Sequence, residues 1–233
     1  MIYAAALTLV LSQETHTIAI SVQPNDRFEY KLEFKVEAVS ENTSVDVKTR
    51  FAERVVSASS KSVVFSTYFL VDDVKAVGPL QAAANTFSDM HKQVFLFDRN
   101  IQNALLSTTY QGVKMDGSAT TNTSDVTYPE RPIKIGDQWP QTKILNGGVK
   151  IDFTNELKGV TQWKGVEAWH IVALPAKSEV VATPTPFEYY IEKSSGRMIF
   201  SKGSLTMAIP QAPMPLTVSY QLERTKTMLA PRK

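Results

Sequence analysis

Two segments near the start of the chain alternate between apolar and charged residues. The even positions of 28–38 are apolar, while the odd positions carry Glu or Lys. A similar alternation returns over 45–55. Because successive side chains of a strand point to opposite faces, this pattern predicts an antiparallel hairpin with one buried and one solvated face. One register sets Glu37 opposite Arg50, which pairs opposite charges across the hairpin.

The segment 62–71 differs, because apolar residues occupy both of its faces. A strand of this kind needs cover on each side. The next segment, 79–91, opens with proline after glycine and repeats apolar residues at helical spacing, so it predicts a helix. Either packing of this helix on the sheet or a cavity filled by ligand explains the two apolar faces. The candidate residues lining such a cavity are Phe65, Phe69, Phe87 and Met90.

Alternating segments return in the second half of the chain, separated by turn-forming glycines and prolines. We therefore predict a mostly β fold, as a curved antiparallel sheet or half-barrel of about ten strands with one covering helix near 79–91. The prolines between 129 and 140 can separate two subdomains, but one continuous sheet with a waist there is the simpler interpretation. Residues 13–233 are expected to form a single β-rich domain.

The chain opens with MIYAAALTLVL, an uncharged apolar run that is too short to span a membrane. Its length and small residues predict a signal-peptide remnant over 1–12, and hence export to the periplasm or cell envelope. The positively charged start of a signal peptide is missing, so a first apolar strand or helix is the alternative. No other segment reaches the roughly eighteen consecutive apolar residues of a membrane-spanning helix, so none is predicted.

Composition removes several kinds of chemistry. The 233 residues include no cysteine, which excludes disulfides, thiolate nucleophiles and thiolate metal sites. The net charge is +2, with basic and acidic residues interspersed. No basic block marks a surface for nucleic acid, so no nucleic-acid partner is expected.

Catalytic and cofactor motifs are missing from the sequence as well. The three histidines, His16, His91 and His170, do not fall in HExxH or HxH spacing. Neither a GxSxG elbow nor a glycine-rich nucleotide loop occurs. The most visible carboxylate pair, Asp72-Asp73, points to opposite faces if it lies on a strand. We therefore predict no catalytic residue, no metal and no cofactor.

The segment Lys134–Trp139, KIGDQW, resembles a K-x-G-D-x-W turn found in bacterial exported β-rich domains of uncharacterised function. Two later hairpins, over Gly159–Gly165 and Tyr190–Arg197, extend the resemblance to roughly residues 128–225. It implies a β-rich fold and no catalytic residues. In this turn Gly136 is expected to supply an unusual backbone geometry, Asp137 to bind turn amides, and Trp139 to bury its ring.

The strands between residues 28 and 69, together with the predicted helix, resemble the half-barrels of bacterial lipoprotein carriers, in which a curved sheet wraps round a helix. This resemblance implies a non-enzymatic cell-envelope module that binds a lipid or another apolar or amphiphilic ligand. The alternative is a structural or protein-interaction domain of the envelope, which presents its sheet edge or proline loops to an envelope protein. An enzyme of unknown type is the third choice.

Overall fold

The computed structural model describes residues 14–38, 42–117, 125–144, 149–208 and 215–231. The predicted signal-peptide remnant lies outside these residues. The strands are β1 (Arg27–Ala38), β2 (Ser44–Ala58), β3 (Ser62–Val77), β4 (Val94–Asn100), β5 (Leu105–Tyr110), β6 (Val113–Asp116), β7 (Gln138–Ile144), β8 (Lys150–Trp163), β9 (Val166–Pro175), β10 (Val181–Thr183), β11 (Phe187–Glu192), β12 (Met198–Met207) and β13 (Leu216–Met228). A short 3-10 turn, Gly78–Leu80, leads into the helix α1 (Gln81–Asp89).

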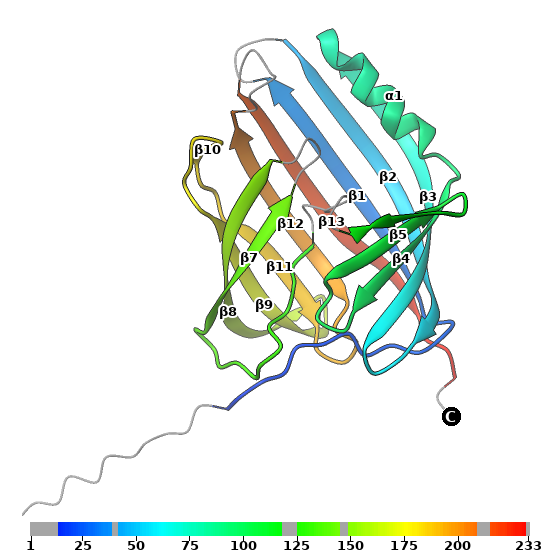
Figure 1. Ribbon diagram of the computed structural model, residues 1–233, viewed down its shortest axis with the longest axis vertical. Helices are drawn as coiled ribbons and strands as arrows, with labels where there is room; N and C mark the ends of the chain where they lie inside the picture. The colour runs from blue at the N-terminus through cyan, green and yellow to red at the C-terminus, as the bar shows by residue number, and fades with distance from the viewer. Residues whose placement is uncertain (1–13, 39–41, 118–124, 145–148, 209–214, 232–233) are drawn as a thin grey trace, which may run out of the picture.

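All thirteen strands belong to one antiparallel sheet, in the order β6-β5-β4-β3-β2-β1-β13-β12-β11-β9-β8-β7, with β10 beside β12. The sheet curls into a half-barrel whose edges, β6 and β7, do not pair with each other (Figure 1). The predicted fold class is confirmed, including the single helix. The strands outnumber the ten expected partly because β6 and β10 are too short to show a period of two.

The β1–β2 hairpin pairs in a different register from the one expected. Glu37 lies opposite Ser44, and Arg50 lies opposite Lys31, so the predicted pairing of Glu37 with Arg50 is wrong. The Arg50 guanidinium instead donates from Nε to Asp72 of β3 at 2.9 Å. Matching charges across two strands was misleading because a third strand supplies the partner.

The helix packs on the concave face of the sheet, at one end of β1, β2 and β3 (Figure 1). Phe87 contacts Phe34 with ring centroids 5.4 Å apart, and Ala84 packs against Val45 and Val47. The helix therefore does not cover the second apolar face of β3. The outer residues of that strand, such as Tyr68, remain half-buried on the convex side. No helix among the described residues is long and apolar enough to cross a membrane.

The opposite end of the half-barrel is closed by two segments without regular structure. Residues 14–26 cross this end, where the backbone N–H of Ile20 donates to the carbonyl of Ile101 at 2.7 Å. Residues 125–137 connect the two edges of the sheet, and the Tyr128 hydroxyl donates to the carbonyl of Gly196 at 2.8 Å. A Cβ on Gly196 would meet backbone atoms of 14–26, so only glycine allows the close approach.

Burial decreases along the concave face from the closed end toward the helix. On β1, Phe28 and Tyr30 are buried, whereas Leu32 and Phe34 are only half-buried. Side chains fill the closed end as a solid core. In the middle of the concave face the inward side chains, such as Leu32, Phe51 and Phe69, are only half-buried, and we call this surface the trough.

Candidate functional site

A continuous row of aromatic rings crosses the concave face of five neighbouring strands. Tyr30, Phe51, Phe69, Phe95 and Tyr110 come from β1, β2, β3, β4 and β5 in turn. Successive ring centroids lie 4.9, 5.5, 5.6 and 4.6 Å apart. The row forms because strand pairing sets each ring beside the next, and such contacts favour tilted or offset rings at these separations.

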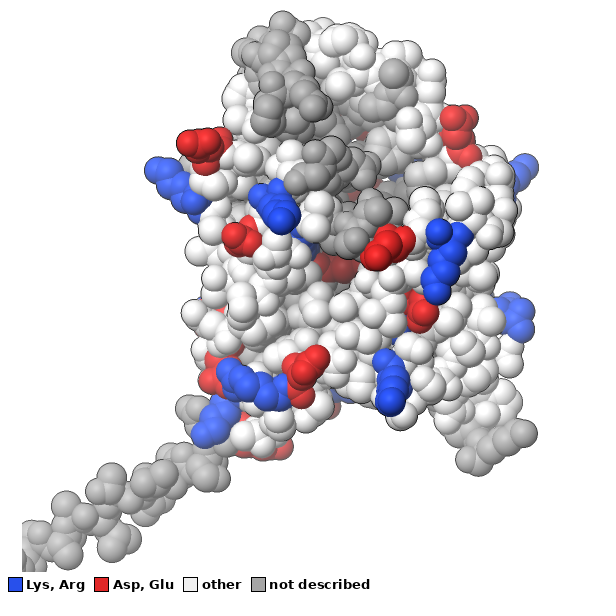
Figure 2. Space-filling view, in the orientation of Figure 1, with Lys and Arg blue, Asp and Glu red and all other residues white. Residues whose placement is uncertain are grey.

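The row is only partly covered. Tyr30 is buried, but the other four rings are half-buried although they point to the inside of the half-barrel. In the space-filling view the same side of the molecule is hollowed, with an acidic side chain deep in the hollow (Figure 2). These rings therefore present an apolar surface inside a recess.

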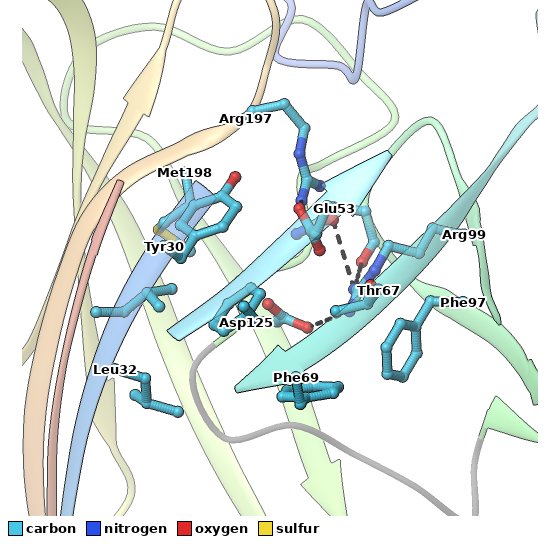
Figure 3. A pocket seen from close by; sticks show the side chains of 13 residues that line it. Tyr30, Leu32, Glu53, Thr67, Phe69, Phe97, Arg99, Asp125, Arg197 and Met198 are labelled. Atoms are coloured by element: carbon cyan, nitrogen blue, oxygen red, sulfur yellow. Dashed lines mark hydrogen bonds and ion pairs between the residues drawn. The ribbon is translucent and has the colours of Figure 1, made fainter. Parts of the chain in front are cut away.

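A cavity of about 80 Å³ lies against this row (Figure 3). Its apolar wall consists of side chains from β1, β2, β3, β4, β12 and β13, and its other wall carries charged and polar groups. The apolar lining is Leu32, Phe51, Phe69, Phe97, Met198 and Leu222. The polar lining is Tyr30, Glu53, Thr67, Arg99, Asn103, Asp125 and Arg197.

Two ion pairs form the polar side of the cavity, which we call the charged floor: Glu53, Arg197, Arg99 and Asp125. Arg197, in the β11–β12 turn, pairs through Nη2 with Glu53 of β2. Arg99 of β4 donates from Nη2 to Asp125 at 2.6 Å. Burial disfavours the charged form of Arg197, but the Glu53 carboxylate, together with Tyr30 and Tyr128, outweighs this effect and holds the pKa of the guanidinium above its ordinary value.

Several polar atoms of the cavity lining have no hydrogen-bond partner among the described residues. They are Tyr30 Oη, Thr67 Oγ1, Arg99 Nε and Arg197 Nε. The residues carrying them are buried, with exposed fractions of 2%, 1%, 6% and 6%. A buried polar group without a partner is costly, so such groups in a cavity indicate a polar occupant, either water or part of a ligand.

A buried lysine lies in the other half of the barrel interior. Lys143 of β7 is fully buried, and its Nζ donates to the Tyr189 hydroxyl at 3.1 Å and lies 4.9 Å from the ring centre of Phe153. Burial lowers the pKa of Lys143 from 10.5 to about 7, partly opposed by the negative charge of Asp125. A second cavity of about 20 Å³ adjoins this amine.

The residues predicted to line a cavity separate into three places. Phe69 lies in the lining of the cavity described here. Phe65 is fully buried in the solid core, with the Arg197 guanidinium 4.2 Å from its ring centre. Phe87 lies on the helix against β1, and Met90 caps the C-terminal end of that helix. Sequence reasoning missed the charged floor, although Glu53 and Arg99 are charged residues at inward positions of their strands.

The turn residues lie together at the start of β7. Gly136 has φ +90° and donates its N–H to the carbonyl of Leu157 at 2.7 Å. The Asp137 carboxylate accepts the backbone N–H of Lys134 at 3.1 Å, and this bond lowers the pKa of Asp137 below its ordinary value. Trp139 is buried and donates from Nε1 to the carbonyl of Thr127 at 2.7 Å. These contacts are those of an architectural turn.

The sequence-identified carboxylate pair lies away from the cavity. Asp72 is bound by Arg50 and Asp73 by Lys75, both at the surface. Among the residues that the structure describes, no three His, Asp or Glu side chains are grouped so that they could hold a metal ion.

No protein-family model and no curated protein matches the chain. Among solved structures, one of lipovitellin, described for its lipid–protein interactions, resembles this chain over 91% of its residues at 8% identity, with a TM-score of 0.45. The match covers 26% of the lipovitellin chain, so this protein spans about a quarter of that length.

Two bacterial structures resemble nearly the whole chain. A domain assigned to outer membrane lipoprotein sorting from Vibrio parahaemolyticus has 9% identity and a TM-score of 0.30, covering 90% of this chain and 87% of its own. A DUF1329 family protein from Desulfovibrio piger has 8% identity and a TM-score of 0.27, covering 87% and 86%. All three scores lie below 0.5, so the likeness to these structures is coarse.

Proposed function

We propose that this protein binds a long apolar or amphiphilic molecule in the trough, as a non-enzymatic binding module. The observation that carries the proposal is the row of half-buried rings on the concave face, which ends at a cavity with a polar side. Concave sites with mostly apolar lining and a few polar groups are typical of small-molecule binding.

The energetics favour an apolar chain along the row. Each Å² of exposed apolar surface that a ligand covers favours the free energy of binding by about 25 cal/mol. Phe51, Phe69 and Phe95 are each half-buried before any ligand binds, so a chain lying across them buries further ring surface. The rings are held by their neighbours in the row, which reduces the entropy lost on binding.

The charged floor favours binding over catalysis. Each carboxylate, Glu53 and Asp125, already accepts from an arginine. Two hydroxyls of the cavity lining, those of Tyr30 and Thr67, have no hydrogen-bond partner in the described part of the chain, so neither has a general base within reach there. Nucleophilic catalysis requires such a base.

The place of action that we propose is the bacterial cell envelope, where apolar chains are abundant. It is supported by the apolar run over residues 1–11 and by the exported β-rich domains that the KIGDQW segment resembles. Mass spectrometry of the mature N-terminus, purified from the native host, tests this part of the proposal. A mature chain that keeps Met1 would contradict cleavage of a signal peptide.

A matched pair of variants tests the binding site. Phe69→Asp places a charge in the trough, and Tyr68→Asp makes an equivalent change one residue away on the convex face of β3. Affinity for a fluorescent hydrocarbon, diphenylhexatriene, is expected to fall at least tenfold in Phe69→Asp and to stay within twofold in Tyr68→Asp. Equal effects of both variants, or no binding by the wild-type protein, would contradict the proposal. Circular dichroism confirms that each variant folds.

The sheet edge supports a second candidate, a protein-interaction role. β6 ends the sheet, and its Val113 is 64% exposed. An edge strand offers unpaired backbone groups to an added strand of a partner. Lys114 is the next residue of β6 and directs its backbone N–H away from β5, toward the open edge. Lys114→Pro removes that donor and would abolish capture of an envelope protein if this edge is used, while leaving hydrocarbon binding unchanged.

A further inference from the structure

The cavity beside the aromatic row has a donor-rich polar side. We infer that this side recognises a neutral oxygen acceptor on the ligand, of the ester class, in preference to a free carboxylate. The inference rests on the proposed function and specifies which polar group the bound chain carries.

The available hydrogen-bonding atoms define what fits. Arg99 Nε and Arg197 Nε carry hydrogens and act only as donors, while the Tyr30 and Thr67 hydroxyls donate or accept. All four atoms belong to residues that line one cavity, and none has a partner in the described part of the chain. An oxygen with free lone pairs is therefore the complementary group, as in an ester or a hydroxyl.

The zero net charge of the charged floor favours binding of a neutral acceptor over binding of an anion. Two guanidinium groups, Arg99 and Arg197, face two carboxylates, Glu53 and Asp125, so these four groups sum to zero charge. A carboxylate entering the cavity would leave one net negative charge in a buried site, beside two acidic side chains that repel it. Burial of an uncompensated charge is far more costly than burial of a hydrogen-bonded neutral group.

The distribution of apolar and polar atoms sets the orientation of the ligand. Thr67 lies on the inward face of β3, between Phe65, which belongs to the core, and Phe69, which belongs to the aromatic row. Leu32 and Phe69 lie on the side of the cavity away from Arg197 and Glu53 (Figure 3), and Leu222 also belongs to the apolar lining. An ester at the floor thus has its alkyl chain directed along the aromatic row, where apolar surface is exposed.

Thr67 offers a substitution that separates binding from folding. Thr67→Val keeps the shape of the side chain and removes a hydroxyl that has no partner in the described residues. Removing an unsatisfied buried hydroxyl is not expected to lower stability. Thr67→Ser keeps the hydroxyl and serves as the matched control.

The experiment measures displacement of diphenylhexatriene from the wild-type protein and both variants at pH 8. The competitors are methyl laurate and laurate, which share a twelve-carbon acyl chain. In the wild-type protein the ester is expected to compete at least tenfold better than the carboxylate. Thr67→Val should weaken the ester about fivefold more than it weakens the hydrocarbon, the loss of roughly one hydrogen bond. Thr67→Ser should retain ester affinity.

The outcomes separate this inference from the proposed function. If the hydrocarbon binds but laurate competes as well as the ester, or Thr67→Val leaves ester affinity unchanged, the inference is wrong and the cavity floor holds only water. If neither the hydrocarbon nor the ester binds, the proposed function itself is wrong.

Discussion

Arg197 and Glu53 lie 144 positions apart in the sequence and form an ion pair inside the half-barrel. Their side chains are 7% and 9% exposed. Glu53 extends inward from β2, and Arg197 reaches it from the β11–β12 turn at the closed end. The pair thus links the N-terminal strands to the C-terminal strands and forms half of the cavity floor.

Breaking this pair is expected to destabilise the protein strongly. Arg197→Met leaves the Glu53 carboxylate buried without its partner, which typically costs about 3 to 5 kcal/mol in the free energy of unfolding. The double variant Arg197→Met/Glu53→Leu removes both charges and should recover most of that loss. Urea denaturation measures both. Additive losses in the double variant would show that the two groups do not interact.

The turn before β7 depends on the backbone of Gly136. A Cβ at this position has no neighbour within 4 Å, so any cost of substitution comes from φ +90° alone. Gly136→Ala should lower the free energy of unfolding by about 1 to 2 kcal/mol, the usual penalty for a left-handed residue with a Cβ. Gly136→Asn should cost less, because asparagine tolerates this region better. Thermal unfolding that ranks alanine equal to glycine would contradict the prediction.

Lys143 makes the free energy of unfolding rise as the pH rises above about 7. Burial lowers its pKa in the folded protein to about 7, so between pH 7 and its unfolded value near 10.5 the unfolded chain binds more protons. The free energy of unfolding therefore gains up to about 1.4 kcal/mol per pH unit from this group as pH rises above 7.

The variant Lys143→Met lacks this dependence and provides the reference. The stability difference between wild type and variant should grow in favour of wild type from pH 7 to pH 9. Buried tyrosines away from Lys143 with raised pKa values, such as Tyr30, are present in both proteins and cancel in the difference. Urea unfolding at four pH values measures it, and a constant difference would refute the lowered pKa of Lys143.

The sheet could be predicted from the sequence because one face of each long strand is solvated. In β1, β2, β8 and β13 the charged residues fall on the outer face, apart from Glu53 and Arg224, so the period of two is visible. The helix was equally visible, from proline at its start and apolar residues at helical spacing. The location of the helix could not be predicted, because both faces of β3 are apolar and the sequence does not indicate against which of them the helix packs.

Most of the candidate site could not be predicted from the sequence, because its polar residues occupy inward positions where the apolar alternation predicts apolar side chains. Glu53 and Arg99 are charged residues at inward positions, where alternation predicts apolar ones. Their partners come from a turn and from the segment connecting the sheet edges, and only the three-dimensional fold brings them together. Phe69 was predictable because its strand is apolar on both faces, which indicated a neighbouring cavity or helix.

The location of a bound chain tests the central claim most directly. Methyl laurate gives intermolecular NOEs only to those leucine methyl groups that its acyl chain contacts. Leu32 and Leu222 line the cavity, whereas Leu70 and Leu96 lie on the convex face of β3 and β4. We expect NOEs from the acyl chain to the methyl groups of Leu32 and Leu222 and none to those of Leu70 and Leu96. NOEs to the convex leucines alone, or no NOE at saturating ligand, would contradict binding in the trough.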